Sequence, residues 1–193
     1  MKNYISNQSG RSMIEMLGVL AIVGVLSVAG IAGYSKAMAK YKVNKAVDQI
    51  STIVANTRTV FSSQGNYKGL GNNTTAFNLG IFPEEMVKDC TEKSCDPKHA
   101  FGKSLTLMAY ASADSQYEGY SYYYFHLFLY EISKDACTAL VTTDWGPASG
   151  FAGFYKNKLI TAAEMQQSAA TNAATLCECS NNQNNCYLEF VFK

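Results

Sequence analysis

One acidic residue lies at the edge of a long apolar segment near the N-terminus. Residues 16–33 are 18 consecutive residues without a charged side chain, and Glu15 comes just before them. As a helix, this segment would reach about 27 Å, close to the roughly 30 Å hydrocarbon core of a bilayer. A carboxylate is costly to hold in apolar surroundings, which makes Glu15 a candidate functional residue. The alternative is an interfacial glutamate at the end of a membrane helix.

Cysteines form the second group of reactive side chains. Their even number, in a region of about 130 residues beyond the apolar segment, indicates disulfides in a compartment outside the cytoplasm. The sequence does not choose among the connectivities. We favour two short local loops and one long loop that ties the C-terminal end to the sheet. The expected pairs are therefore Cys90–Cys95, Cys137–Cys177 and Cys179–Cys186.

A zinc site is the alternative for the first two cysteines. Cys90, Cys95 and His99 have the spacing C-x4-C-x3-H, with Asp89 or Asp96 as a fourth ligand. The disulfide interpretation is favoured, so we expect no metal.

Catalytic motifs are absent from the sequence. It has two histidines and no Gly-x-Ser-x-Gly, P-loop or His-Glu-x-x-His pattern. Cys137 and His126 could form a dyad only if the fold brought them together. We therefore expect neither an enzyme nor a cofactor.

Charge is distributed unevenly although the formal net charge is only +1. Residues 36–58 carry five basic side chains and one acidic side chain, whereas residues 59–193 carry nine lysines and 13 acidic residues. An acidic C-terminal domain is not expected to bind nucleic acid. Basic residues normally mark the cytoplasmic flank of a membrane helix, and the lysines after residue 33 would place the C-terminal domain inside. The cysteines favour the opposite orientation.

A single long helix must position Glu15. No proline occurs before Pro83, and Gly65-Asn66 supplies a stop signal, which predicts a helix from about Ser12 to about Ser63. Its first half is apolar all round, and its second half is amphipathic. The apolar stripe of that second half is Ala39, Val43, Val47, Ile50, Val54, Thr57 and Phe61.

The rest of the chain has a composition typical of an antiparallel sheet. Between residues 63 and 101 it is loop-like, with a short helical turn at Pro83, and the capping box of Thr161 and Glu164 begins a helix that runs to Leu176. The fold class is thus α+β, with the long helix packed on a C-terminal sheet. Expected strands are 104–111, 120–132, 138–143 and 187–192.

The second of these strands is aromatic on both faces. Alternation places Tyr124, His126 and Phe128 on one face and Phe125 and Leu127 on the other, so we expect an interior strand covered on two sides. The tyrosines nearby could instead stack on a carbohydrate, a weaker interpretation.

The segment Gly10-Arg11-Ser12-Met13-Ile14-Glu15 resembles the processing signature of type IV prepilins and pseudopilins. In that family a peptidase cuts after the glycine, and the fifth mature residue is glutamate. The resemblance implies cleavage between Gly10 and Arg11, with Glu15 at mature position five. Arg11 stands where the family usually has an apolar, N-methylated residue. Ala32 replaces a frequent proline, so we expect no proline kink.

The resemblance also implies the domains and the function. Residues 1–10 would be a leader, 11–33 a membrane-spanning and filament-core half-helix, 34–63 its amphipathic half, and 64–193 a disulfide-bonded domain with a pilin fold. The chain would be a prepilin of the bacterial inner membrane that polymerises into an extracellular pilus. Its partners would be other pilin subunits, the prepilin peptidase, the inner-membrane assembly platform and the membrane itself. The element order is similar to that of type IVb pilins.

Two other functions remain open. A minor pilin or a type II secretion pseudopilin would have the same architecture, although six cysteines favour a pilus. A secreted binding module would use the apolar segment only as a signal peptide, cleaved near Gly30-Ile31-Ala32.

Overall fold

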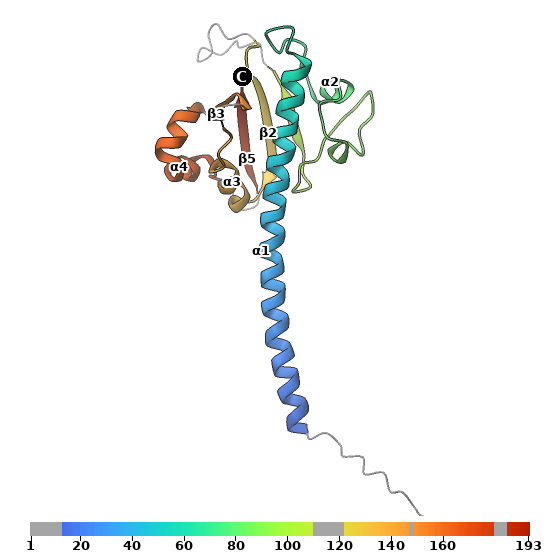
Figure 1. Cartoon of the computed structure of the whole chain (residues 1–193), viewed down its shortest axis with the longest axis vertical. Coiled ribbons are helices and arrows are strands. Elements are labelled where there is room, and N and C mark those ends of the chain that lie inside the picture. The colour runs from blue at the N-terminus through green and yellow to red at the C-terminus, as the bar shows by residue number, and fades with distance from the viewer. Residues whose placement is uncertain (1–12, 110–121, 147–148, 180–184) are drawn as a thin grey trace, which may run out of the picture. The chain divides into compact units, whose positions relative to one another are not determined.

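The computed structural model describes residues 13–109, 122–146, 149–179 and 185–193 (Figure 1). The chain divides into two compact units, Met1–Lys40 and Tyr41–Lys193. The first contains the apolar part of the long helix, and the second contains the rest of that helix together with the sheet.

Helix α1 spans Met13–Val60 without interruption. The prediction of one long helix is confirmed, although its last turn is shorter than expected and Ser12 lies outside the described residues. After Val60 the chain makes a turn, in which the Gln64 N–H donates to the Phe61 carbonyl at 3.0 Å. Gly65 then adopts a positive φ of 66°, which fits its expected role in ending the helix.

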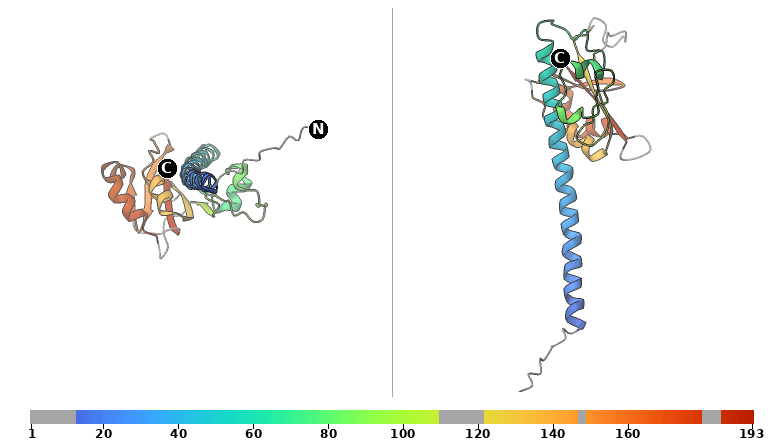
Figure 2. Two further views of the ribbon diagram at one scale, coloured as in Figure 1. Left: turned by 90° about the horizontal axis from the view of Figure 1, so that it is seen from below. Right: turned by 90° about the vertical axis from the view of Figure 1, so that its right-hand side faces the viewer.

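The second half of α1 packs on one face of the sheet, within the second unit (Figures 1 and 2). Ile50, Val54 and Phe61 of the expected stripe are buried in a single core cluster, and Val43 and Val47 pack against it at partial exposure. Because this face must exclude water, the polar side chain of Gln49 on it is unexpected. Other buried residues of this face are Ala46, Ile53 and Thr57.

A five-stranded antiparallel sheet forms the other layer, in the order β1-β2-β5-β3-β4. The C-terminal strand β5 lies at its centre, and Phe192 aligns with Phe125 of β2 and with Phe151 of β3. Strand β2 is an interior strand with both faces buried over its first five residues, as the aromatic alternation predicted. The strand bounds are β1 Leu105–Met108, β2 Phe125–Ile132, β3 Phe151–Lys156, β4 Lys158–Thr161 and β5 Cys186–Phe192.

The prediction of a strand at residues 138–143 is wrong. Residues 138–143 contribute instead to helix α3, which spans Lys134–Val141. The Ser133 hydroxyl caps it by accepting from the Ala136 N–H at 3.2 Å. Buried residues recur at helical spacing, with Cys137 and Val141 four apart, so packing overrides the β-branched composition.

Other elements complete the second unit. The predicted helix after Thr161 is present as α4, Ala162–Leu176, with its capping box formed. The turn at Pro83 is a short 3-10 helix, η1, Glu84–Met86. Helix α2, Asn73–Asn78, and strands β3 and β4 were not predicted.

The Asn73 carboxamide closes the β1 edge of the sheet. It donates to the Leu105 carbonyl and accepts from the Leu107 N–H, each at 2.8 Å. It thus replaces the partner strand that an edge would otherwise lack.

Gly153 provides a test of this packing. It has a φ of +152°, and a Cβ there would collide with the Ile160 carbonyl oxygen on β4. We expect Gly153→Ala to lower the free energy of unfolding by at least about 2 kcal/mol. Gly71→Ala is the control, because nothing lies within 4 Å of its added Cβ. Equal unfolding midpoints of the two variants in detergent would contradict the described pairing of β3 and β4.

Candidate functional site

The first unit consists of the apolar part of α1. Within the described ranges, α1 alone is long and apolar enough to cross a membrane. Its large hydrophobic side chains are exposed from Met13 to Tyr34. Glu15 lies in its first turn, at the boundary predicted from the sequence. Gly10 and Arg11, the predicted processing residues, lie outside the described residues.

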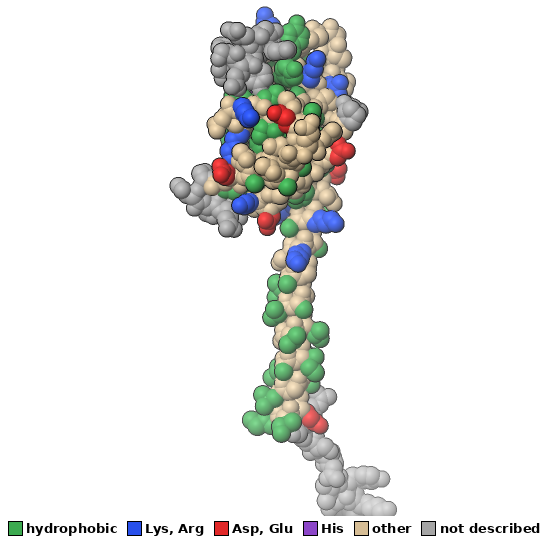
Figure 3. All heavy atoms as spheres, turned by 90° about the vertical axis from the view of Figure 1, so that its left-hand side faces the viewer, with side chains coloured by type: hydrophobic (Ala, Val, Ile, Leu, Met, Phe, Trp, Pro, Cys, Tyr) green, Lys and Arg blue, Asp and Glu red, His purple; other side chains and the backbone are tan. Residues whose placement is uncertain are grey.

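Polar groups in this apolar region are satisfied by the helix itself. The Ser27 hydroxyl donates to the Val23 carbonyl at 2.7 Å, and the Ser35 hydroxyl donates to the Ile31 carbonyl at 3.0 Å. These bonds lower the cost of placing serine in an apolar environment. Figure 3 shows hydrophobic side chains over the visible face of this part of α1. A carboxylate cannot be satisfied in this way, because it has no proton to donate at neutral pH.

Three disulfides join the cysteines in the same pairs that loop length favoured. Cys90–Cys95 closes a local loop, and Cys179–Cys186 closes a second one next to β5. Cys137–Cys177 joins α3 to the end of α4 with a Cα–Cα distance of 5.8 Å. No free cysteine occurs among the described residues. The three crosslinks agree with a domain that folds in an oxidising compartment.

These disulfides exclude the chemical alternatives for the same cysteines. Cys90 and Cys95 share a covalent bond and therefore supply no thiolates for zinc. Cys137 is buried in its own disulfide, so it is not a nucleophile beside His126. Across the described ranges, no three acidic, cysteine or histidine side chains gather in a metal-binding group.

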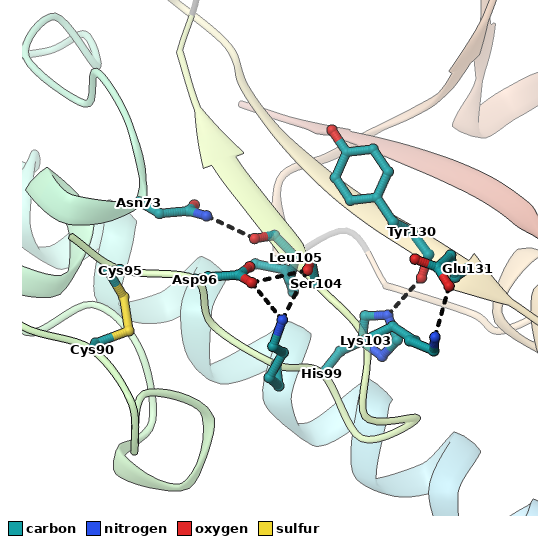
Figure 4. A network of polar contacts seen from close by, with 11 residues as sticks. Asn73, Cys90, Cys95, Asp96, His99, Lys103, Ser104, Leu105, Tyr130 and Glu131 are labelled. Atoms are coloured by element: carbon teal, nitrogen blue, oxygen red, sulfur yellow. Dashed lines mark hydrogen bonds and ion pairs between the residues drawn. A yellow bond between two sulfur atoms is a disulfide. The ribbon is translucent and has the colours of Figure 1, made fainter.

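His99 is buried in a polar network between the 90–105 loop and β2 (Figure 4). Its Nδ1 accepts from the Phe101 N–H at 3.2 Å, so the proton must lie on Nε2, which donates to the Tyr130 carbonyl at 2.9 Å. Burial lowers the pKa of this imidazole below its usual range, because a charged ring would lose its hydration. The neutral form agrees with the hydrogen bonds of both ring nitrogens. Lys103 pairs with Glu131 nearby at 2.7 Å.

His126 belongs to a second buried polar group, on the sheet face opposite the core. Its Nδ1 lies 2.7 Å from Glu189 Oε1 on β5, and the Tyr187 hydroxyl donates to Glu189 Oε2 at 2.6 Å. The pair of one carboxylate and one imidazole was not foreseen, because 63 residues separate the partners in the chain. Only the register of β2 against β5 brings them together.

The sequence also did not predict the structural role of Lys156. Its ammonium donates to the backbone carbonyls of Thr175, Leu176 and Glu178, at 2.9, 3.2 and 3.1 Å. These carbonyls are at the C-terminal end of α4, where a helix leaves carbonyls unpaired and favours a positive charge. Lys156 thus stabilises the segment that carries Cys177 and Cys179.

Comparison with known proteins identifies the family. The bundlin family profile matches residues 35–193, which is most of the chain and all of its sheet domain. The chain belongs to the bundlin family of type IV pilins. No curated protein sequence matches it. The crystal structure of TcpA, a type IV pilin from Vibrio cholerae El Tor biotype, is 14% identical, covers 79% of this chain and 99% of TcpA, and gives a TM-score of 0.46.

Membership in the pilin family makes the chain a structural subunit and not an enzyme. The apolar half of α1 fits a pilin that is first held in a membrane. The family match begins at residue 35, after the segment that carries Glu15.

The neutral state of His99 makes the stability of this pilin dependent on pH. Its pKa is lower in the folded chain than in the unfolded chain, where it is about 6.5. The contribution of neutral His99 to the free energy of unfolding is therefore complete above about pH 6.5, and it is lost as the pH falls below that value. His99→Gln keeps a donor and an acceptor but does not titrate. We expect urea unfolding between about pH 7 and pH 5 to show a steeper loss of stability in the wild type, by at most about 1.4 kcal/mol per pH unit.

His126 is present in both proteins, so the comparison isolates His99. Equal pH dependence of wild type and His99→Gln would contradict the neutral, buried state of His99.

Proposed function

We propose that this pilin is made as a prepilin, is cut between Gly10 and Arg11, and polymerises through α1 into an extracellular type IV pilus. The observation that carries the proposal is the position of Glu15, a carboxylate in the first turn of a long exposed apolar helix. An exposed helix of this kind needs an apolar environment. The membrane supplies it before assembly, and neighbouring helices supply it in a filament.

Cleavage would provide a positively charged group for the Glu15 carboxylate in a filament. Removal of residues 1–10 frees a positive α-amino group on Arg11. In a filament, the Glu15 carboxylate of one subunit pairs with the Arg11 amine of its neighbour, so neither charge is left alone in the apolar bundle. The prepilin peptidase and an inner-membrane assembly platform are the implied partners. The apolar area buried between helices, at about 25 cal/mol per Å², holds the subunits together.

The cysteines indicate on which side of the membrane the C-terminal domain lies. Three disulfides in the second unit favour a C-terminal domain outside the cytoplasm, against the lysines that follow the apolar segment. The order of β2, Cys137 in α3, α4, Cys177 and the final strand favours a type IVb-like pilin. Disulfide content also favours a pilus over a pseudopilin or minor pilin.

A secreted module with an ordinary signal peptide is the alternative from another class. Gly30, Ile31 and Ala32, its expected cleavage site, lie inside α1, which continues for seven turns or so beyond them. Cleavage there would cut a regular helix, so the structure gives this alternative no support.

The N-terminus of the mature chain distinguishes the two functions. We expect intact-mass analysis and N-terminal sequencing of protein from purified fibres to give a chain that starts at Arg11, with or without a methyl group. A start at Gly33 would support the secreted module instead. A retained ten-residue extension would contradict processing after Gly10.

Removal of the Glu15 carboxylate tests its role in assembly. We expect Glu15→Ala to insert in the membrane at the wild-type level, because an apolar side chain is better tolerated there. Filament yield should fall at least about tenfold, since the Arg11 amine loses its partner. Glu92→Ala, an exposed glutamate in the 90–95 loop, is the control and should assemble normally. Wild-type yield from Glu15→Ala would remove Glu15 from the mechanism.

A further inference from the structure

A polar groove lies between α1 and η1 within the second unit. Its volume is about 350 Å³, and its walls include Tyr41, Asn44, Asp48 and Gln49 of α1 and Glu85 of η1. The groove lies on α1, the helix through which subunits contact each other in the proposed filament. It is therefore a candidate contact surface for a second copy of the chain.

Charges in this groove do not balance. Both oxygens of Glu85 are occupied, because Lys45 Nζ lies 3.1 Å from Oε2 and Gln49 Nε2 donates to Oε1 at 2.6 Å. Asp48 is exposed and forms no ion pair among the described residues. One lysine against two carboxylates leaves the groove with a charge of −1.

Gln49 gives a second sign of an incomplete site. Its side chain is 5% exposed, and its Oε1 has no hydrogen-bond partner in the described part of the chain. The amide cannot be reversed without pointing an oxygen at Glu85. A buried acceptor without a partner is uncommon in native proteins. The groove thus offers the exposed Asp48 carboxylate, which suits a positively charged donor from outside the chain.

Exposed lysines of α1 could supply this donor from a neighbouring subunit. Lys40 and Lys42 are exposed and form no ion pair within the described ranges. Lys45 is already held by Glu85 of its own chain.

The proposed pairing of Glu15 with Arg11 favours Lys42 over Lys40 as the lysine that reaches the groove. Glu15 and Arg11 are four residues apart, and at the helical rise four residues span about 6 Å, so a helical mature N-terminus would give neighbouring subunits an axial offset of about 6 Å. Helical symmetry applies the same axial offset to every atom. Each residue of the neighbour therefore lies level with the residue four positions later in α1. Lys42 of the neighbour comes level with Ala46, about 3 Å below Asp48, whereas its Lys40 lies about 6 Å below Asp48.

We propose that Asp48, in the groove between α1 and η1, binds Lys42 of a second copy of the chain. This inference rests on the proposed function, because the offset comes from the Glu15–Arg11 pairing. The contact lies in the part of α1 that packs on the sheet domain, so it links subunits outside the apolar bundle. Together with the Glu15–Arg11 pair, it would fix the axial position of one subunit relative to the next.

A charge exchange tests the contact. We expect Asp48→Lys and Lys42→Asp each to lower filament yield at least about tenfold, because each places like charges together. The double variant, Asp48→Lys with Lys42→Asp, restores the opposite charges and should return to within about threefold of wild type. Asp135→Lys, an exposed charge reversal on α3, is the control. Unchanged thermal unfolding of the subunits in detergent excludes a folding defect.

Crosslinking provides a direct readout. Filaments assembled from a mixture of ¹⁴N- and ¹⁵N-labelled chains are treated with a carbodiimide, which joins a carboxylate to an amine in contact with it. We expect crosslinked peptides that pair Asp48 of one isotope with Lys42 of the other.

The inference is overturned if the single variants assemble normally, if the double variant stays defective, or if Asp48 crosslinks only within its own chain. These results would leave the proposed function intact, provided that the wild type is processed and Glu15→Ala fails to assemble. A wild-type chain that forms no filaments would overturn the proposed function and this contact with it.

Discussion

A carboxylate next to an apolar helix must stay near water or lie beside a positive charge. In this pilin the constraint falls on Glu15, which occupies the first turn of a helix whose exposed surface is apolar as far as Tyr34. The serines of the same region bond to their own backbone, so they place no demand on a partner. A charge such as that of Glu15 is stabilised in apolar surroundings by an opposite charge beside it. A lipid bilayer can hold the helix, but its hydrocarbon core does not stabilise a charge.

The sheet domain satisfies a different constraint, because it must stay folded while α1 exchanges one apolar environment for another. Its core is built from the second half of α1 and the inner face of the sheet. The Cys137–Cys177 disulfide and Lys156 hold the end of α4 near the sheet. Because these contacts lie within the second unit, they do not depend on the surroundings of the first.

The long helix and the two short disulfide loops could be predicted from the sequence because each depends on local information. A charge-free run, the absence of proline and a Gly-Asn stop define α1, and short loops favour Cys90–Cys95 and Cys179–Cys186. Helix α3 was mistaken for a strand because its β-branched residues were read without its Ser133 cap. Strand β3 contains Gly153, a residue that weakens a strand pattern in the sequence, yet the close approach of Ile160 requires a glycine there.

Residues of the candidate contact surfaces were less predictable. Glu15 could be found because a single charge stands out in an apolar run. Gln49 and Glu85 are 36 residues apart, and nothing in their local sequence indicates that they meet. The same holds for His126 and Glu189, which only the β2–β5 register brings together. Asp48 reads as an ordinary charge on an amphipathic helix until the groove around it is seen.

Electron cryomicroscopy of purified filaments tests the central claim most directly, since it places Glu15 and the mature N-terminus in one map. We predict that a Glu15 carboxylate oxygen lies within about 4 Å of the Arg11 α-amino nitrogen of a neighbouring subunit, with an axial offset of about 6 Å between the two subunits. A map in which Glu15 faces only apolar side chains, or in which the amine is paired with another group, would contradict the account.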